Sequence, residues 1–208
     1  MRKNIIWYFS GAIAAGFLLL TAFVLLDPLS LIDREFSEEV QEHHNQLLDH
    51  VMKLISWFGY MPGSAILIAA TALLFLLFGY KKEALFVLLT ALSGLVSTLV
   101  KLLVNRPRPV PTLVRVIEKT QQQSFPSGHV LFYTVFFGFL VLLMYRLAHL
   151  PKTLRILVAI ISVFFLFTVP VSRIYLGAHW LTDVLAGFFL GLLSLASLSY
   201  FYLKNERS

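Results

Sequence analysis

Six long runs of apolar residues constrain the fold of this chain more than any other feature of its sequence. The runs cover residues 5–26, 62–79, 84–104, 129–148, 155–171 and 183–203. Most of them approach the roughly 20 apolar residues that an α-helix needs to cross a bilayer. A backbone inside a bilayer must close its hydrogen bonds within each segment, so we expect every run to be helical. The sequence predicts an all-α integral membrane bundle of six transmembrane helices, with residues 1–208 forming a single domain.

Composition supports a membrane protein and excludes several other classes. Of the 208 residues, 58% are hydrophobic and only 13% are charged. The chain contains no cysteine, which excludes a disulfide framework, a thiol nucleophile and a thiolate metal site. The net charge of +6 does not indicate a nucleic-acid partner, because the basic residues form short clusters between apolar runs. We attribute the basic excess to membrane topology and to an anion-binding site.

Lysine and arginine residues in short loops predict the orientation of the bundle. With six spans, one side receives four basic clusters: Arg2 with Lys3, Lys81 with Lys82, Arg146 with Lys152 and Arg155, and Lys204 with Arg207. This side is expected to be cytoplasmic, with both termini on it. The outer side then receives residues 27–61, 105–128 and 172–182. The segment 105–128 breaks the topology rule with Arg106, Arg108, Arg115 and Lys119, and binding an anion would explain why these cations lie outside.

The segment 34–58 carries apolar residues at helical spacing opposite a set of acidic residues. This pattern predicts an amphipathic helix at the outer interface. A solvated connector packed on the bundle is an alternative, and a gate for lipid access is a more specific hypothesis. Its His43, His44 and His50 are expected to be surface residues and not metal ligands, because no carboxylate accompanies them at ligand spacing.

Three stretches on the predicted outer side contain most of the polar groups that chemistry could use. The first holds Lys101 near the end of the third run and the pair Arg108-Pro109 just beyond it. Pro107 and Pro109 are expected to stop the helix. Taken alone, the stretch is explained equally well by a lysine that snorkels and an arginine that contacts a lipid headgroup.

The second stretch is Pro126-Ser127-Gly128-His129, at the start of the fourth run. Helix capping alone could explain the first three residues. A helix N-terminus also binds anions through its free N–H groups, and Gly128 lets the backbone approach a phosphate closely. His129 would then lie in the first turn, where it could protonate a leaving oxygen.

The third stretch contains Ser172-Arg173, then His179 and Asp183. On a helix, residues four apart share a face, so Asp183 could fix the tautomer of His179 and raise its basicity. A His–Asp pair on a helix surface is the alternative interpretation. The guanidinium of Arg173 has a planar geometry suited to phosphate oxygens.

Taken together and in this order, the three stretches resemble the signature motifs of the type 2 phosphatidic acid phosphatase family. Six residues separate Lys101 from Arg108, five separate Arg173 from His179, and three more precede Asp183, as in the family pattern. The short chain resembles the bacterial members, which implies a multi-pass protein of the bacterial plasma membrane with its active site at the outer face.

The resemblance implies a mechanism for these residues. The phosphate-binding residues would be Lys101, Arg108, Ser127, Gly128 and Arg173. His179, oriented by Asp183, would attack phosphorus and form a phosphohistidine. His129 would protonate the leaving oxygen and later activate water. No metal or other cofactor is expected, because the cationic side chains neutralise the phosphate; a zinc site formed by His129, His179 and Asp183 is the alternative.

The expected activity is hydrolysis of a terminal lipid phosphate, with phosphatidylglycerol phosphate as the first candidate substrate and undecaprenyl diphosphate as the second. A six-span transporter is a competing class, but transporters usually place ionisable residues near mid-membrane. Here those residues gather at one boundary. A catalytically silent lipid-binding protein is a third possibility, and it would be expected to lack the histidines or the aspartate.

Overall fold

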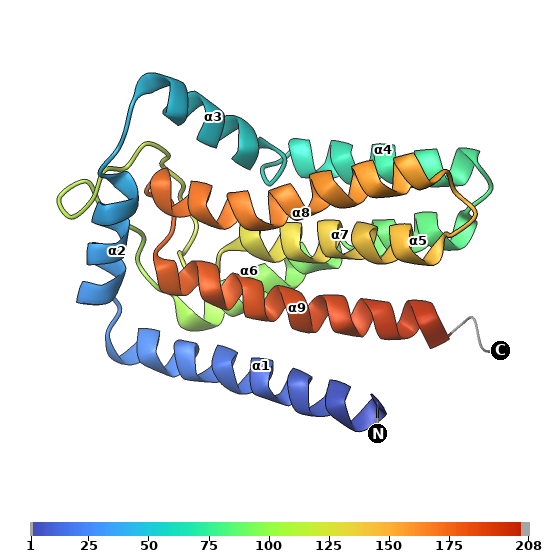
Figure 1. Ribbon diagram of the computed structural model, residues 1–208. Helices are drawn as coiled ribbons and strands as arrows, with labels where there is room; N and C mark the ends of the chain where they lie inside the picture. The colour runs from blue at the N-terminus through green and yellow to red at the C-terminus, as the bar shows by residue number, and fades with distance from the viewer. Residues whose placement is uncertain (1, 205–208) are drawn as a thin grey trace.

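The computed structural model describes residues 2–204, with side chains from residue 7 onward; Met1 and residues 205–208, including the predicted cytoplasmic Arg207, lie outside the described residues. Within residues 2–204 the chain forms nine α-helices and no β-strand, as Figure 1 shows. The helices are α1 (Arg2–Leu26), α2 (Leu31–Gln41), α3 (Gln46–Trp57), α4 (Gly63–Leu77), α5 (Lys81–Leu89), α6 (Leu92–Val104), α7 (Gly128–Arg146), α8 (Lys152–Tyr175) and α9 (Leu181–Lys204). The all-α prediction is confirmed.

Each predicted apolar run forms helix, but the runs are not all equally long. Among the described residues, five segments are long and apolar enough to cross a membrane: Trp7–Leu26, Lys81–Val104, Gly128–Arg146, Lys152–Tyr175 and Leu181–Lys204. The remaining run, predicted over residues 62–79, forms the 15-residue helix α4. At 1.5 Å per residue α4 is about 22 Å long, less than the roughly 30 Å hydrocarbon core. The predicted count of six spanning helices is therefore not confirmed.

The run predicted over residues 84–104 is interrupted in its middle. The chain passes from α5 to α6 through a tight turn in which the N–H groups of Thr90, Ala91 and Ser93 each bond the carbonyl three residues earlier. The Thr90 hydroxyl also donates to the Val87 carbonyl at 2.6 Å. These bonds satisfy the backbone locally, so one apolar segment accommodates two helices.

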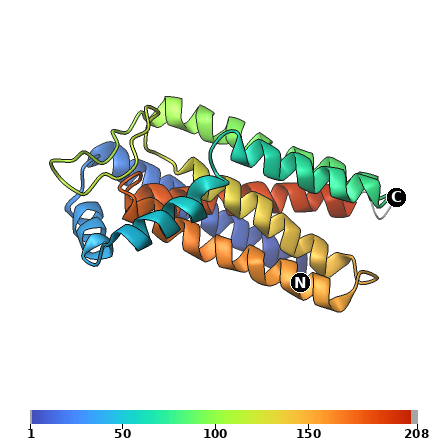
Figure 2. The same cartoon turned by 90° about the horizontal axis from the view of Figure 1, so that it is seen from above.

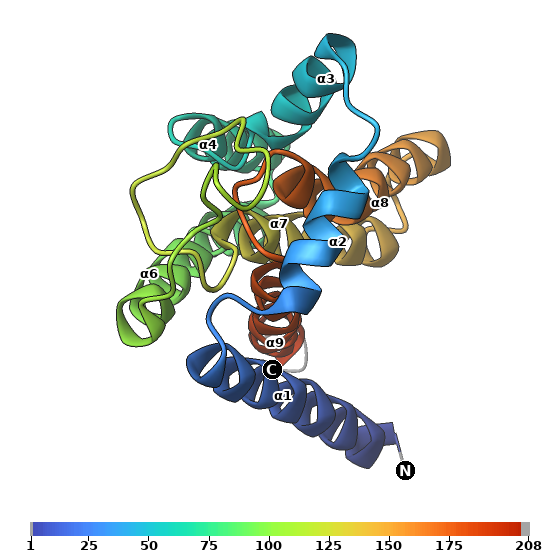
Figure 3. The same ribbon diagram turned by 90° about the vertical axis from the view of Figure 1, so that its left-hand side faces the viewer.

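Helix α7 lies at the centre of the bundle and contacts α8, α9, α6 and α5. Its buried face is rich in aromatic rings, among them Tyr133, Phe136 and Phe137, and Phe165 of α8 stacks on Phe137 with ring centroids 4.9 Å apart. The N-terminal helix α1 packs on α9 at the edge of the bundle, as the end-on view of Figure 3 shows. Among the five described segments that could cross a membrane, α7 is the most buried, so the second motif starts the most enclosed of them.

The amphipathic segment is two helices and not the single helix predicted over residues 34–58. The break falls at residues 42–45, where Asn45 caps α3 by accepting a hydrogen bond from Leu48 N at 2.8 Å. An asparagine N-cap starts a new helix, which explains why the apolar periodicity does not continue as one helix. Helix α2 crosses the end of the bundle beside α8 and α9, and α3 lies against α8 (Figure 3).

The loops that carry the three motifs gather at one end of the bundle. Figures 1 and 2 show the long connection between α6 and α7 at this end, together with α2 and the turn between α8 and α9. The N-terminal end of α1 and the C-terminal end of α9 lie at the opposite end. The motifs therefore share one end of the molecule.

Candidate active site

Lys101 lies in the last turn of α6, which ends where Asn105 adopts a left-handed backbone conformation with φ of 48°. The lysine is only 5% exposed. Its ammonium donates hydrogen bonds to the backbone carbonyls of Gln123 at 2.6 Å and Pro126 at 2.9 Å. The side chain therefore points into the loop between α6 and α7 and does not snorkel to the surface. These bonds connect the first motif to the start of the second.

Arg108 connects the first motif to the third. Its Nη1 donates to the Ala178 carbonyl at 2.6 Å and lies 3.4 Å from Nε2 of His179. Burial, and next the charge of Arg173, lower the pKa of Arg108 to about 10. The guanidinium is therefore still charged at neutral pH. Arg108 also lines a surface cavity of about 410 Å³ beside the loop, so it contacts both the cavity and His179.

Ser127 immediately precedes α7, and its side chain is fully buried. Within residues 2–204 its hydroxyl has no hydrogen-bond partner, so the alternative interpretation, in which this side chain caps the helix, is not observed. Its N–H donates to the Asp183 carbonyl at 2.9 Å, which connects the second motif to the third. Nε2 of His129 is likewise buried and unpaired in the described part of the chain. Both atoms are free to bond a ligand.

Two glycines allow backbone segments of the site to approach closely. A Cβ on Gly128 would lie 2.9 Å from the Ser97 hydroxyl and 3.9 Å from Cε of Lys101. Gly177, in the turn after α8, has a φ of 64°, and a Cβ there would overlap the Arg115 carbonyl oxygen. A side chain at Gly177 would therefore clash with the loop and force a disfavoured backbone conformation.

Arg173, near the end of α8, is completely buried. Its Nη1 donates to Oε2 of Glu118 at 2.8 Å, while its Nε and Nη2 have no partner among residues 2–204. The Tyr60 ring lies 5.2 Å from the guanidinium carbon and 4.2 Å from the imidazole ring of His129, measured between centroids for the two rings. Tyr60 therefore packs against two predicted site residues. Neither Tyr60 nor Glu118 belongs to a motif, and we did not predict a role for them.

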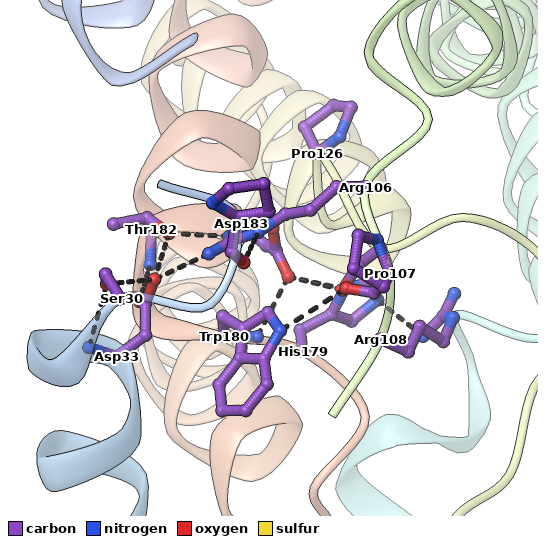
Figure 4. A network of polar contacts seen from close by, with 12 residues as sticks. Ser30, Asp33, Arg106, Pro107, Arg108, Pro126, His179, Trp180, Thr182 and Asp183 are labelled. Atoms are coloured by element: carbon purple, nitrogen blue, oxygen red, sulfur yellow. Dashed lines mark hydrogen bonds and ion pairs between the residues drawn. The ribbon is translucent and has the colours of Figure 1, made fainter. Parts of the chain in front are cut away.

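His179 and Asp183 are neighbours, as predicted, but not on one helix. Helix α9 begins at Leu181, so His179 lies in the preceding turn (Figure 4). Nδ1 of His179 lies 3.6 Å from Oδ2 of Asp183, which is longer than a hydrogen bond. The Asp183 carboxylate accepts hydrogen bonds from the N–H of Trp180 at 2.9 Å and from Nη1 of Arg106 at 2.6 Å. It therefore caps α9 and also faces the imidazole.

The imidazole of His179 is surrounded by cations. It is 2% exposed, and burial first, then the charges of Arg108, Lys101 and Arg173, lower its pKa well below 6.5. At neutral pH the ring is therefore uncharged, which is the form that can act as a nucleophile. Nε2 faces Arg108 and Nδ1 faces Asp183, so Nε2 is the nitrogen that faces the predicted phosphate-binding cations.

Two arginines that break the topology rule bind carboxylates of the protein itself. Arg106 donates to Asp183 at 2.6 Å and to Asp33 at 2.7 Å, and the arginine is 2% exposed. Arg115 makes a two-pronged contact to Asp49, at 2.9 Å and 2.6 Å. Anion binding had been our explanation for the arginines of this loop. Arg106 and Arg115 instead pair with carboxylates of the protein. The sequence alone does not indicate which acidic residues these are.

Metal ligation finds no support in the described part of the chain. Among residues 2–204, no group of three or more His, Cys, Asp or Glu side chains lies close enough together to hold a metal ion. The alternative zinc site at His129, His179 and Asp183 therefore lacks a ligand set. His43, His44 and His50 are exposed, in agreement with their prediction as surface residues.

The sequence profile of the PAP2 superfamily matches residues 82–207, more than half of the chain. The chain belongs to this superfamily. Phosphatidylglycerophosphatase B of Bacillus subtilis is 45% identical over 74 residues, which cover 34% of this chain and 34% of that protein. The match therefore spans about a third of the length of this curated relative.

Two solved structures resemble the whole molecule. One is described as the first transmembrane PAP2 type phosphatidylglycerolphosphate phosphatase from Bacillus subtilis. It superposes with a TM-score of 0.80 and 26% identity, covering 95% of this chain and 97% of that chain. The second, Aquifex aeolicus LpxE, has a TM-score of 0.64 and 21% identity, covering 86% of this chain and 98% of that one, and shows the shared fold.

Proposed function

We propose that this chain is an integral membrane phosphatase that hydrolyses the terminal phosphate of a lipid. The observation that carries the proposal is a set of buried polar atoms without a partner in the described residues, on Ser127, His129, Arg173 and His179. Buried polar atoms of native proteins are normally hydrogen-bonded, so such a concentration indicates a polar ligand. Guanidinium, hydroxyl and imidazole groups together suit a phosphoryl group.

The cations around these atoms support a phosphate as the ligand. Arg108 lies against His179, and Lys101 and Arg173 contribute further positive charge at the same imidazole. Fixed cations stabilise the charge that spreads over the phosphoryl oxygens in the transition state. The α7 N-terminus, with Gly128 at its first position, adds backbone N–H groups.

The proposed reaction has two steps. Nε2 of His179 attacks phosphorus and the bond from phosphorus to the lipid oxygen breaks. His129, protonated in the complex with the anionic phosphate, gives that oxygen its proton. In the second step His129 takes a proton from water, and the water oxygen attacks phosphorus. The bond between phosphorus and Nε2 of His179 then breaks, and inorganic phosphate leaves. Asp183, 3.6 Å from Nδ1, stabilises the positive charge that His179 acquires in the first step.

The relatives support a phosphatidylglycerol phosphate substrate. Both the curated relative and one solved structure carry that substrate in their names, and the structural match covers nearly all of both chains. Undecaprenyl diphosphate is the second candidate, since the three motifs would bind the phosphate and would not distinguish the apolar part of the lipid. We place the protein in a bacterial plasma membrane with the motif end outside and both termini in the cytoplasm, as the basic clusters indicate.

A substrate panel with a nucleophile variant tests the proposal. Purified protein in detergent is given phosphatidylglycerol phosphate, phosphatidic acid and undecaprenyl diphosphate, and phosphate release is measured. The wild-type protein should release phosphate, and His179→Ala should reduce the rate by about 10³-fold or more while the protein still inserts and purifies. Normal turnover by His179→Ala would refute the nucleophile assignment.

Chelation tests whether the reaction is metal-independent. Treatment with a chelator should leave the rate of phosphate release unchanged, because Lys101, Arg108 and Arg173 supply the positive charge. A rate that disappears with the chelator and returns with a divalent cation would overturn this part of the proposal.

A further inference from the structure

Arg106 lies between two carboxylates at the N-terminal end of α9, as Figure 4 shows. Its Nη2 donates to Asp33 at 2.7 Å and its Nη1 to Asp183 at 2.6 Å, and all three side chains are fully buried. Asp33 comes from α2, Arg106 from the loop after α6 and Asp183 from α9. Asp33 lies outside residues 82–207, which match the superfamily.

Further hydrogen bonds hold this cluster together. Asp33 accepts from the N–H of Thr182 at 2.9 Å, from the Thr182 hydroxyl at 2.8 Å and from the Ser30 hydroxyl at 3.0 Å. Nη1 of Arg106 also donates to the Thr182 hydroxyl at 2.7 Å. Asp33 therefore holds both Arg106 and the first turn of α9, the turn that carries Asp183.

The cluster also has an electrostatic consequence for the nucleophile. Two carboxylates and one guanidinium leave one net negative charge, buried beside His179. The groups that face His179 otherwise are Lys101 of α6, His129 of α7, Arg173 of α8 and the loop residue Arg108. In the absence of Asp33, the charge of Arg106 would fully offset that of Asp183. The carboxylate nearest the imidazole would then stabilise a developing positive charge less.

We infer that Asp33 and Arg106 are positioning residues of the proposed phosphatase, which act on His179 through Asp183. Arg106 orients the Asp183 carboxylate, and Asp33 supplies the second negative charge that keeps the cluster anionic. This inference rests on the proposed function, because it assigns a role in the same reaction. It also gives the α2 segment, whose sequence indicated only an interfacial helix, a part in the chemistry.

A double-mutant cycle tests the inference. Asp33→Asn should lower kcat by about tenfold with little change in KM, because it removes a charge and leaves the substrate contacts intact. It should also move the acid limb of the kcat profile to lower pH, since loss of a negative charge lowers the pKa of the nearby imidazole. In an Asp183→Asn background, Asp33→Asn should lower kcat by no more than about threefold, because only the through-space effect of its charge remains once the Asp183 carboxylate that it helps to position is gone.

Asp49→Asn is the matched control. Asp49 also pairs with an arginine of the loop between α6 and α7, namely Arg115. Unlike Arg106, Arg115 makes its ion pair with Asp49 and not with Asp183. The pH profile of Asp49→Asn should equal that of the wild type even where its thermal stability is lower. A folded Asp33→Asn protein with a wild-type profile, or with losses that add to those of Asp183→Asn, would overturn the inference.

Two further measurements keep the outcomes distinct. If Asp33→Asn does not fold, Arg106→Lys carries the same cycle, because lysine keeps the charge but cannot bridge both carboxylates; losses that add to those of Asp183→Asn again overturn the inference. Wild-type protein that releases no phosphate from any substrate refutes the proposed function and the inference with it. Active wild type, inactive His179→Ala and additive losses in the cycle refute the inference alone.

Discussion

Single acidic residues determine which cations of the candidate site are available to a ligand. Glu118 pairs with Arg173, Asp49 pairs with Arg115, and Arg106 is shared by two aspartates. Arg115 and Arg106 donate hydrogen bonds to carboxylates of the protein, so those donors are not available to a ligand. Arg173 still has Nε and Nη2 without a partner in the described residues. The positive charge offered to a phosphate therefore depends on internal ion pairs as much as on the number of arginines.

Glu118→Gln should strengthen the binding of inorganic phosphate. The carboxylate contacts Arg173 at 2.8 Å and is partly exposed, so it competes with an anion for the same guanidinium. Removing its charge should lower the inhibition constant of phosphate about fivefold, which corresponds to roughly 1 kcal/mol at a partly screened site. Glu38→Gln, which breaks the exposed pair with Arg34, is the control and should leave the constant unchanged. Weaker inhibition in Glu118→Gln would show that Glu118 orients Arg173.

The pH dependence of kcat should report the lowered pKa of His179. Burial and three nearby cations favour the neutral ring, so protonation removes the nucleophile only well below pH 6.5. At saturating substrate, the fall of kcat on the acid side that is due to His179 should therefore lie below that pH. Ionisation of the substrate phosphate can also lower kcat, so the profile is measured with two substrates whose phosphates differ in pKa. The fall due to His179 should occur at the same pH for both. An enzyme limb at or above pH 6.5 would contradict this assignment.

At the scale of helices, the positions of the helix ends determine the candidate site more than the lengths of the helices do. The turn between α8 and α9 places His179, and the segment from α2 to α3 covers the same end of the bundle (Figure 3). Gln41 of α2 donates to the carbonyls of Arg115 at 2.8 Å and Tyr175 at 3.0 Å, and its side-chain oxygen accepts from the N–H of Arg115. One side chain thus fastens α2 to the loop and to the end of α8.

Gly177→Ala should destabilise the protein and impair turnover together. A Cβ at this position would overlap the Arg115 carbonyl oxygen, and the φ of 64° is unfavourable for alanine. We expect a loss of about 1–3 kcal/mol, measured as a lower Tm in detergent. Gly94→Ala is the control, because a Cβ there meets nothing within 4 Å and alanine favours the helix. An unchanged Tm in Gly177→Ala would refute the role of the turn.

Asp49 should stabilise α3 in a pH-dependent way. Hydrogen bonds from Arg115 and Tyr175 lower the pKa of Asp49 from 3.8 to about 2. Because the folded pKa is depressed, the stabilisation is fully present above pH 3.8 and is lost as the pH falls towards 2. Asp49→Asn should lower the Tm at pH 7, and the difference from wild type should shrink near pH 3. A difference that is constant with pH would contradict the ion pair.

At the scale of the whole molecule, the absence of cysteine makes the predicted orientation directly measurable. A single cysteine introduced as Gln121→Cys lies in the exposed loop at the motif end, and one introduced as Lys152→Cys lies at the other end. A membrane-impermeant maleimide should label the first in intact cells and the second only after permeabilisation. The reverse labelling would invert the proposed topology.

The sequence was sufficient for the all-α class, the positions of the apolar helices and the three motifs that meet at one end. These features depend on local hydropathy and on fixed spacings. The break between α2 and α3, the position of His179 before α9 and the partners of Arg106 depend on contacts between distant segments. A periodic apolar pattern does not show where an asparagine such as Asn45 restarts a helix, and residue types alone do not pair Arg106 with Asp33.

The contact between Asp33 and Arg106 also bears on how such proteins can be recombined. The segment that matches the superfamily contains the buried Arg106, and one of the two carboxylates that pair with it, Asp33, lies 73 residues earlier and outside that segment. A chimera could join residues 82–207 to a foreign N-terminal segment that has no carboxylate in place of Asp33. In such a chimera the buried Arg106 would lack one of its two carboxylate partners. Grafts between relatives should therefore exchange these two positions as a unit.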